Sequence, residues 1–102
     1  MNVSDLKEYI YENKKIEFIL DQIGCHSIKY YPNKNYYRCA NIPNEDGDGS
    51  NPTAITIKNN KYLNCINYTR KQYFNESSDL ITLVQYNKNM SFIEALKYLH
   101  EI

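Results

Sequence analysis

Apolar residues recur at helical spacing near the start of the chain. Within residues 4–23, the spacing i, i+3, i+4, i+7 is met by Ile16, Ile19, Leu20 and Ile23. This pattern predicts an N-terminal helix with one buried face. The polar run Asn13-Lys14-Lys15 is a candidate interruption of that helix. Gly24 is the expected C-cap, because glycine readily adopts the left-handed conformation that ends many helices.

The middle of the chain, residues 26–74, changes to the alternating pattern of strands. The predicted strands lie at 27–31, 36–39, 53–58 and 61–65, with a weaker candidate at 68–74. Pro32 to Asn35 predicts the turn of a first hairpin, and Asn59-Asn60 predicts a tight turn in a second hairpin. The prolines and glycines between the two hairpins predict a loop there.

The last part of the chain, residues 78–102, returns to helical spacing. Ser78 is the expected N-cap of a helix that ends near Tyr86. Ser91 and Glu94 have the spacing of a capping box, which predicts the start of a final helix. The order of elements therefore predicts an α+β fold, in which a small antiparallel, zinc-ribbon-like sheet carries an N-terminal helix and two C-terminal helices.

The length of 102 residues fits a single domain over residues 1–102. The sequence has no apolar run of about 18 residues, so no transmembrane helix is expected. Its N-terminus lacks the apolar stretch of a secretory signal. We therefore expect a cytoplasmic protein without membrane partners. The three cysteines are an odd number, which argues against a disulfide framework in that compartment.

The net charge of the chain is zero, but the charge is unevenly distributed. From His26 to Phe74 there are seven basic residues and three acidic ones, a net charge of +4, and the three acids share one short loop at 45–48. The two helical ends must then carry −4 together. A basic middle between acidic helices is a pattern that favours an anionic partner.

Two cysteines lie where zinc knuckles would be expected. Cys39 ends the first predicted hairpin and Cys65 ends the second. A zinc ribbon needs a pair of ligands at each of these places. The residues three positions later are Ile42 and Tyr68, neither of which binds zinc. The cysteines are either half-sites that retain a zinc ion or, as we expect, small buried residues without a metal.

Residues for catalysis are scarce. His26 and His100 are the only histidines, and the sequence has no Ser/His/Asp set and no glycine-rich phosphate loop. We therefore expect a protein that is not an enzyme.

Tyrosine is concentrated in the basic middle of the chain. The seven tyrosines there are Tyr30, Tyr31, Tyr36, Tyr37, Tyr62, Tyr68 and Tyr73. Neighbouring residues of a strand face opposite sides, so each Tyr-Tyr pair is expected to place one ring on each face of the sheet. Exposed aromatic rings among basic side chains suit single-stranded DNA, because every base can stack on a ring. The alternative is that tyrosine is abundant because it favours strands and because an AT-rich genome enriches it.

Several short motifs follow one another in a fixed order, namely Ile16 to Gly24, Tyr36-Tyr37-Arg38-Cys39, Pro52-Thr53, Cys65-Ile66-Asn67-Tyr68, Asp79 to Val84 and Phe92 to Leu99. In this order they resemble the CHC-type zinc-binding domain of bacterial and phage DNA primases. The resemblance covers residues 16–102, and its most specific part is Phe92 to Leu99. The sequence departs from the family at Ile42, where a histidine ligand is usual, and at Tyr68, where the last cysteine is usual.

The resemblance implies a non-catalytic accessory protein of a replication system, typical of a phage or other mobile element. Such a protein would bind single-stranded template DNA and a primase, polymerase or helicase subunit in trans. The expected DNA-binding residues are Lys29, Tyr31, Lys34, Tyr36, Arg38, Lys58, Lys61, Tyr62, Tyr68, Arg70 and Lys71. The alternative is a protein-interaction module that docks on a replication enzyme without touching DNA.

Overall fold

A computed structural model describes residues 2–42, 49–68, 74–75 and 77–102. The helices are α1 (Val3–Glu12), α2 (Ile16–Gln22), α3 (Leu80–Lys88) and α4 (Phe92–His100). The strands are β1 (His26–Tyr31), β2 (Tyr36–Ala40), β3 (Ile55–Lys58) and β4 (Cys65–Asn67). The predicted α+β class with a small antiparallel sheet is confirmed.

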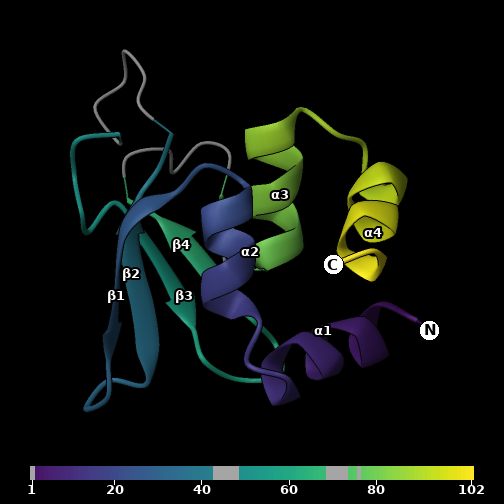
Figure 1. The fold of residues 1–102 in the computed structure, drawn as a ribbon, viewed down its shortest axis with the longest axis horizontal. Coiled ribbons are helices and arrows are strands. Elements are labelled where there is room, and N and C mark those ends of the chain that lie inside the picture. Colours follow the sequence, from purple (N-terminus) through teal and green to yellow (C-terminus); the bar gives the residue numbers. More distant parts are fainter. Residues whose placement is uncertain (1, 43–48, 69–73, 76) are drawn as a thin grey trace.

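The four strands form one antiparallel meander in the order β1-β2-β3-β4. Figure 1 shows the helices gathered on one side of this sheet, and within the described residues no helix covers the other side. The two faces differ as the alternation of a strand requires. On the helical face Cys39, Ile55 and Ile57 are buried, whereas the open face, here called the outer face, carries the intervening polar and charged residues.

The predicted N-terminal helix is two helices with a sharp break between them. Asn13 ends α1, and Lys14 has a left-handed φ of 54°. Both helices contribute to the core through apolar side chains that are almost fully buried, namely Leu6, Ile10, Ile16, Ile19 and Leu20. The break at 13–15 lets both apolar faces reach the same core, which a single straight helix over 4–23 would not allow.

The C-cap of α2 is Ile23 and not the predicted Gly24, which follows it as the left-handed residue that ends the helical segment. The φ of Gly24 is +94°, and the Cys25 amide donates a hydrogen bond to the Leu20 carbonyl across the turn. A Cβ atom at Gly24 would lie 2.6 Å from Cγ1 of Ile42. Both the backbone conformation and the close contact therefore require glycine here.

We expect Gly24→Ala to lower the free energy of unfolding by about 1–2 kcal/mol, because it places a side chain in the left-handed region and against Ile42. Thermal unfolding followed by circular dichroism would measure this as a fall in Tm of several degrees. Asn89 provides a matched control, since it caps α3 with a left-handed φ of 52°. Asn89→Gly should leave Tm almost unchanged, and equal losses from both changes would contradict the argument.

The two C-terminal helices begin at defined caps. The predicted capping box of Ser91 and Glu94 is confirmed, with both reciprocal hydrogen bonds present. The prediction of Ser78 as the N-cap of α3 is wrong. Asp79 takes that position, its carboxylate accepting a hydrogen bond from the Thr82 amide. Asp79 also forms an ion pair of 2.8 Å with Lys7 on α1, which ties the first helix to the third.

The second predicted hairpin differs from the structure. Residues 59–64 form a longer turn instead of the tight Asn59-Asn60 turn, and the strand predicted at 61–65 begins only at Cys65. Leu63 explains the difference, because it lies buried in the core with a left-handed φ of 52°. That conformation interrupts a regular strand ladder. The candidate strand at 68–74 lies largely outside the described residues.

Candidate nucleic-acid interface

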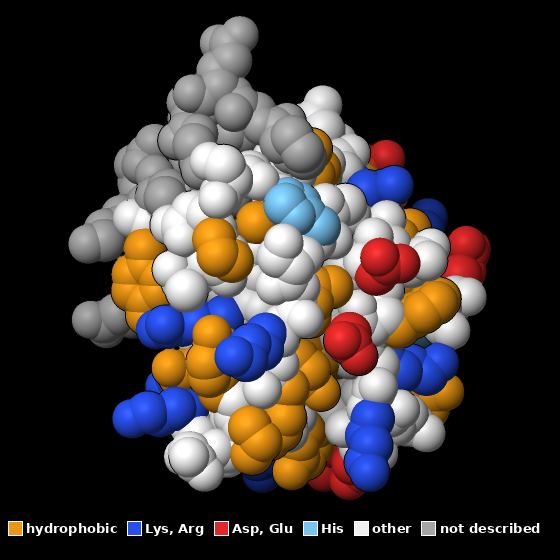
Figure 2. All heavy atoms as spheres, turned by 60° about the vertical axis from the view of Figure 1, so that its left-hand side comes forward, with side chains coloured by type: hydrophobic (Ala, Val, Ile, Leu, Met, Phe, Trp, Pro, Cys, Tyr) orange, Lys and Arg blue, Asp and Glu red, His pale blue; other side chains and the backbone are white. Residues whose placement is uncertain are grey.

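The outer face of the sheet gathers basic and aromatic side chains. The strand register places Lys29 opposite Arg38 and Tyr31 opposite Tyr36 on β1 and β2. It also places Lys58 of β3 opposite Tyr36. Figure 2 shows Lys and Arg side chains interleaved with hydrophobic ones on this side of the molecule. Five of the predicted DNA-binding residues therefore share one face.

Direct contacts hold this group of side chains together. The rings of Tyr31 and Tyr36 meet edge to face with their centroids 5.5 Å apart. The Arg38 guanidinium lies 5.1 Å from the Tyr36 centroid and 5.9 Å from the Tyr31 centroid, and Lys29 lies 5.1 Å from Tyr31. Cation–π contacts at these distances orient the cations without neutralising them. We call Lys29, Tyr31, Tyr36 and Arg38 the basic-aromatic cluster.

Arg38 also covers the centre of the sheet. Its Nε donates a hydrogen bond of 3.3 Å to Thr56 Oγ1, and Thr56 is only 3% exposed although it lies on the outer face. The aliphatic stem of Arg38 thus provides the cover that a helix would otherwise supply. Its guanidinium is held at the surface beside two tyrosine rings.

The charge of this face is of one sign. None of the acidic residues that the structure describes lies on a strand. All of them are in the helices or at the helix caps. Lys29, Arg38 and Lys58 therefore have no described carboxylate on their own face to neutralise them. A surface of this kind attracts phosphate groups. The acidic loop 45–48 lies outside the described residues.

Three further predicted residues lie at one end of the sheet. Lys34 is in the β1–β2 turn, while Lys61 and Tyr62 are in the β3–β4 turn, with the Lys61 ammonium 5.4 Å from the Tyr62 centroid. The two turns are joined, since the Asn59 amide donates to the Asn35 carbonyl at 3.0 Å. These residues extend the basic surface past the strand ends. Arg70 and Lys71 lie outside the described residues.

The prediction that each Tyr-Tyr pair divides between the two faces is confirmed. Tyr30 and Tyr37 pack together on the helical side of the sheet, with ring centroids 4.8 Å apart and the rings tilted by 45°. Burial and the nearby Glu17 raise the pKa of Tyr37. Tyr31 and Tyr36, by contrast, are on the outer face. Tyr68, which follows the end of β4 and is 45% exposed, points to the same side.

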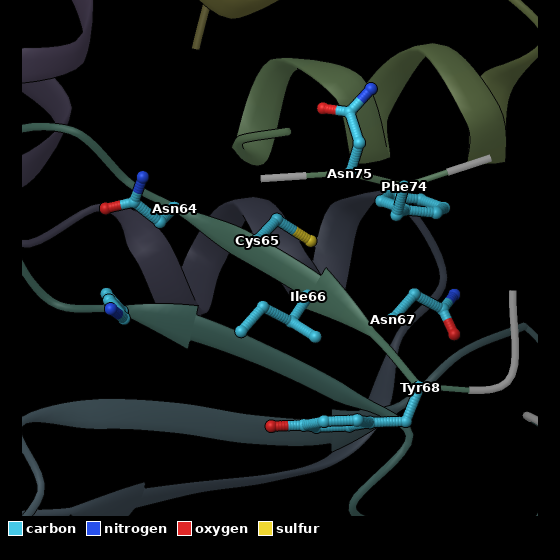
Figure 3. Close-up of a pocket in the computed structure, with 8 residues that line it drawn as sticks. Asn64, Cys65, Ile66, Asn67, Tyr68, Phe74 and Asn75 are labelled. Atoms are coloured by element: carbon cyan, nitrogen blue, oxygen red, sulfur yellow. The ribbon is translucent and has the colours of Figure 1, made fainter. Parts of the chain in front are cut away.

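The positions that correspond to a zinc ribbon do not fit a zinc ion. Cys39 and Cys65 are fully buried on the helical face. Tyr68 points to the opposite side of the sheet from Cys65 (Figure 3), and Ile42 packs against Gly24. Across residues 2–42, 49–68, 74–75 and 77–102, no three His, Cys, Asp or Glu side chains gather as metal ligands.

The cysteines instead belong to the core. A hydrogen bond with Cys25 and burial raise the pKa of the Cys39 thiol, and burial raises that of Cys65. Beside them, the Asn87 side-chain amide donates to Asn41 Oδ1 at 2.7 Å and contacts Cys25 Sγ at 3.7 Å. Protonated thiols of this kind are poor metal ligands and poor nucleophiles.

The two histidines lie at the surface. His26 is exposed, and its ring contacts the Ser27 hydroxyl and the Gly49 carbonyl. His100 lies on the last turn of α4, also exposed. Among the described residues, neither ring contacts a carboxylate, and the Ser27 hydroxyl beside His26 belongs to the neighbouring residue on an exposed strand end.

Sequence reasoning missed a pocket beside β4. Its lining includes Asn64, Ile66, Phe74 and Asn75, none of which was predicted as a site residue. The alternation of β4 would have placed Ile66 on the outer face, had the strand been predicted at 65–67. Phe74 and Asn75 approach β4 only through the tertiary fold.

No helix in the described part of the chain is long and apolar enough to cross a membrane. Comparisons with protein-family models, with curated proteins and with solved structures each found no match.

Proposed function

We propose that this protein is a non-catalytic, single-stranded DNA-binding accessory protein of a replication system, and that the outer face of its sheet is the DNA-binding surface. The observation that supports the proposal most is the basic-aromatic cluster, in which two cations and two tyrosine rings contact one another on an open sheet face. Cations bind the phosphate backbone, while exposed rings stack on bases of any identity.

An open sheet face suits a single strand better than a duplex. Bases of a single strand are free to turn towards the sheet and stack on side chains that stand up from it, as in sheet-based nucleic-acid modules. The rings on this face are the half-buried Tyr31 and Tyr36 and, at the opposite edge, Tyr68, which is 45% exposed. The cations on the same strands, Lys29, Arg38 and Lys58, would bind the phosphates between those bases.

The helical side supports the second part of the proposal, a protein partner in trans. Exposed apolar side chains occur there on α2 and α4, with Phe18 53% exposed, Phe92 44% and Ile93 59%. The partner class, a primase, polymerase or helicase subunit, follows from the resemblance in the sequence. Docking on such an enzyme without DNA contact is the alternative function.

Fluorescence anisotropy with a labelled single-stranded oligonucleotide tests DNA binding. We expect binding at low salt that weakens as salt rises, with a slope of log K against log salt of about −2 for three phosphate contacts. A duplex of the same length should bind more weakly. No binding of the isolated protein at low salt would refute direct DNA binding and favour the interaction module.

A further inference from the structure

A pocket of about 540 Å³ opens beside the edge strand β4. It is lined by Lys58, Asn64, Cys65, Ile66, Asn67, Tyr68, Phe74 and Asn75. Figure 3 shows Ile66 and Tyr68 on one side of β4, with Phe74 and Asn75 on the other. The pocket therefore follows the edge of the sheet from the outer face towards the segment before α3.

The lining combines an apolar surface with polar groups. Ile66 and Tyr68 are 38% and 45% exposed, so a ligand can reach both side chains. Asn64 and Asn75 carry amides that can donate and accept hydrogen bonds, and Asn75 Oδ1 already accepts from Ser77. Lys58 is the single charged residue among the eight, and none of them is acidic.

The pocket is continuous with the basic-aromatic cluster. Lys58 belongs to the pocket lining and lies opposite Tyr36 in the sheet. Ile66 lies opposite Thr56, which in turn lies opposite Arg38. A chain of nucleotides that crosses the outer face from β1 to β4 thus arrives at the pocket without leaving the sheet.

We propose that this pocket binds one unstacked nucleobase of the single strand, with the adjoining phosphate near Lys58. The proposal rests on the DNA-binding function proposed above and adds to it a site that distinguishes between bases. A planar base would lie against Tyr68 and Ile66, and the asparagine amides would meet its polar edge. The volume is within the range of small-molecule sites and exceeds what one base requires.

The chemistry favours a nucleotide over an aromatic side chain of a protein partner. An aromatic side chain would leave the amides of Asn64 and Asn75 and the Lys58 ammonium without matching groups. A nucleotide supplies both a hydrogen-bonding edge and an anion. Stacking on an open ring tolerates any base, whereas hydrogen bonds to a base edge depend on its identity. The pocket is therefore expected to give base preference.

The experiment measures by anisotropy, at one salt concentration, the affinity of the protein for three single-stranded DNA 12-mers, made of deoxythymidine, deoxycytidine or deoxyadenosine alone. For the unmodified protein we expect the Kd values of the tightest and weakest oligonucleotides to differ about 10-fold, which is the effect of losing one base contact. This ratio is called the spread. Ile66→Trp fills the pocket and should reduce that spread to about 2-fold, with an unchanged salt slope. Tyr68→Leu, which removes the ring without filling the space, should reduce it as well.

Tyr11→Trp is the control, since Tyr11 is an exposed aromatic residue on α1, outside both proposed binding surfaces, and should keep the full spread. A spread that survives both Ile66→Trp and Tyr68→Leu overturns the base pocket while DNA binding stands. So does an unmodified protein that binds all three oligonucleotides equally. If no oligonucleotide binds at low salt, the failure is that of the DNA-binding function itself.

Discussion

Replacing Lys29, Arg38 and Lys58 together by glutamine is expected to weaken single-stranded DNA binding about 100-fold at 100 mM salt. The figure follows from counterion release, because each phosphate contact on a single strand contributes about 0.7 to the slope of log K against log salt. Removing three contacts removes about 2 from that slope. The loss should therefore shrink as salt approaches 1 M, and an anisotropy titration at several salt concentrations would measure it.

The control is a triple variant with the same change in net charge, made on the helical side of the molecule. Lys14, Lys88 and Lys97 lie on or beside helices, where they are exposed. Their joint replacement by glutamine should reduce affinity by only a few-fold through the lower net charge. Equal losses in the two triple variants would mean that binding follows overall charge and not the outer face. Circular dichroism would verify that Arg38→Gln, which loses the contact with Thr56, leaves the sheet folded.

The faces of the first hairpin could be predicted from sequence alone. Alternation placed Tyr31 and Tyr36 with the basic residues and Tyr30 and Tyr37 on the other side, and the register confirms both. The reason is local, because successive side chains of a strand point to opposite faces of the sheet. The turn at 32–35 fixed the pairing of the two strands.

The second hairpin could not be predicted in the same way. Leu63 reaches the core from a left-handed backbone conformation inside a turn, and this conformation is rare for a residue with a branched side chain. The Asn60 side chain stabilises that turn by accepting hydrogen bonds from the amides of Tyr62 and Leu63. Such a turn depends on the core that receives Leu63, so propensity favoured a strand where the structure has none.

The candidate pocket depends still more on tertiary structure. Its two sides come from β4 and from Phe74 and Asn75, and the Cys65 amide bonds to the Ser78 carbonyl where the chain returns beside the strand. Asn64 and Asp79 pair across the same edge. No local pattern in the sequence predicts that the segment from Phe74 to Ser78 lies along β4, so the pocket could be found only in the structure.

The cysteines lead to a prediction about stability at alkaline pH. Cys39 and Cys65 have a raised pKa in the folded protein, so their thiols keep their protons at a pH where an unfolded chain loses them. An acid whose pKa is raised by folding stabilises the native state below its unfolded pKa, near 8.5, and this stabilisation is lost as the pH rises above that value. Two such thiols should together lower the free energy of unfolding by about 2–3 kcal/mol per pH unit above pH 9.

Urea denaturation between pH 8 and 10.5 would measure this slope. Cys39→Ala with Cys65→Ala is the comparison, since it keeps every tyrosine and lysine and removes only the two buried thiols. We expect the double variant to be less stable at pH 8, because it leaves small cavities, yet to lose much less stability as the pH rises. Identical slopes in the two proteins would show that the thiols ionise in the folded state, and would return Cys39 and Cys65 to the class of reactive or metal-binding cysteines.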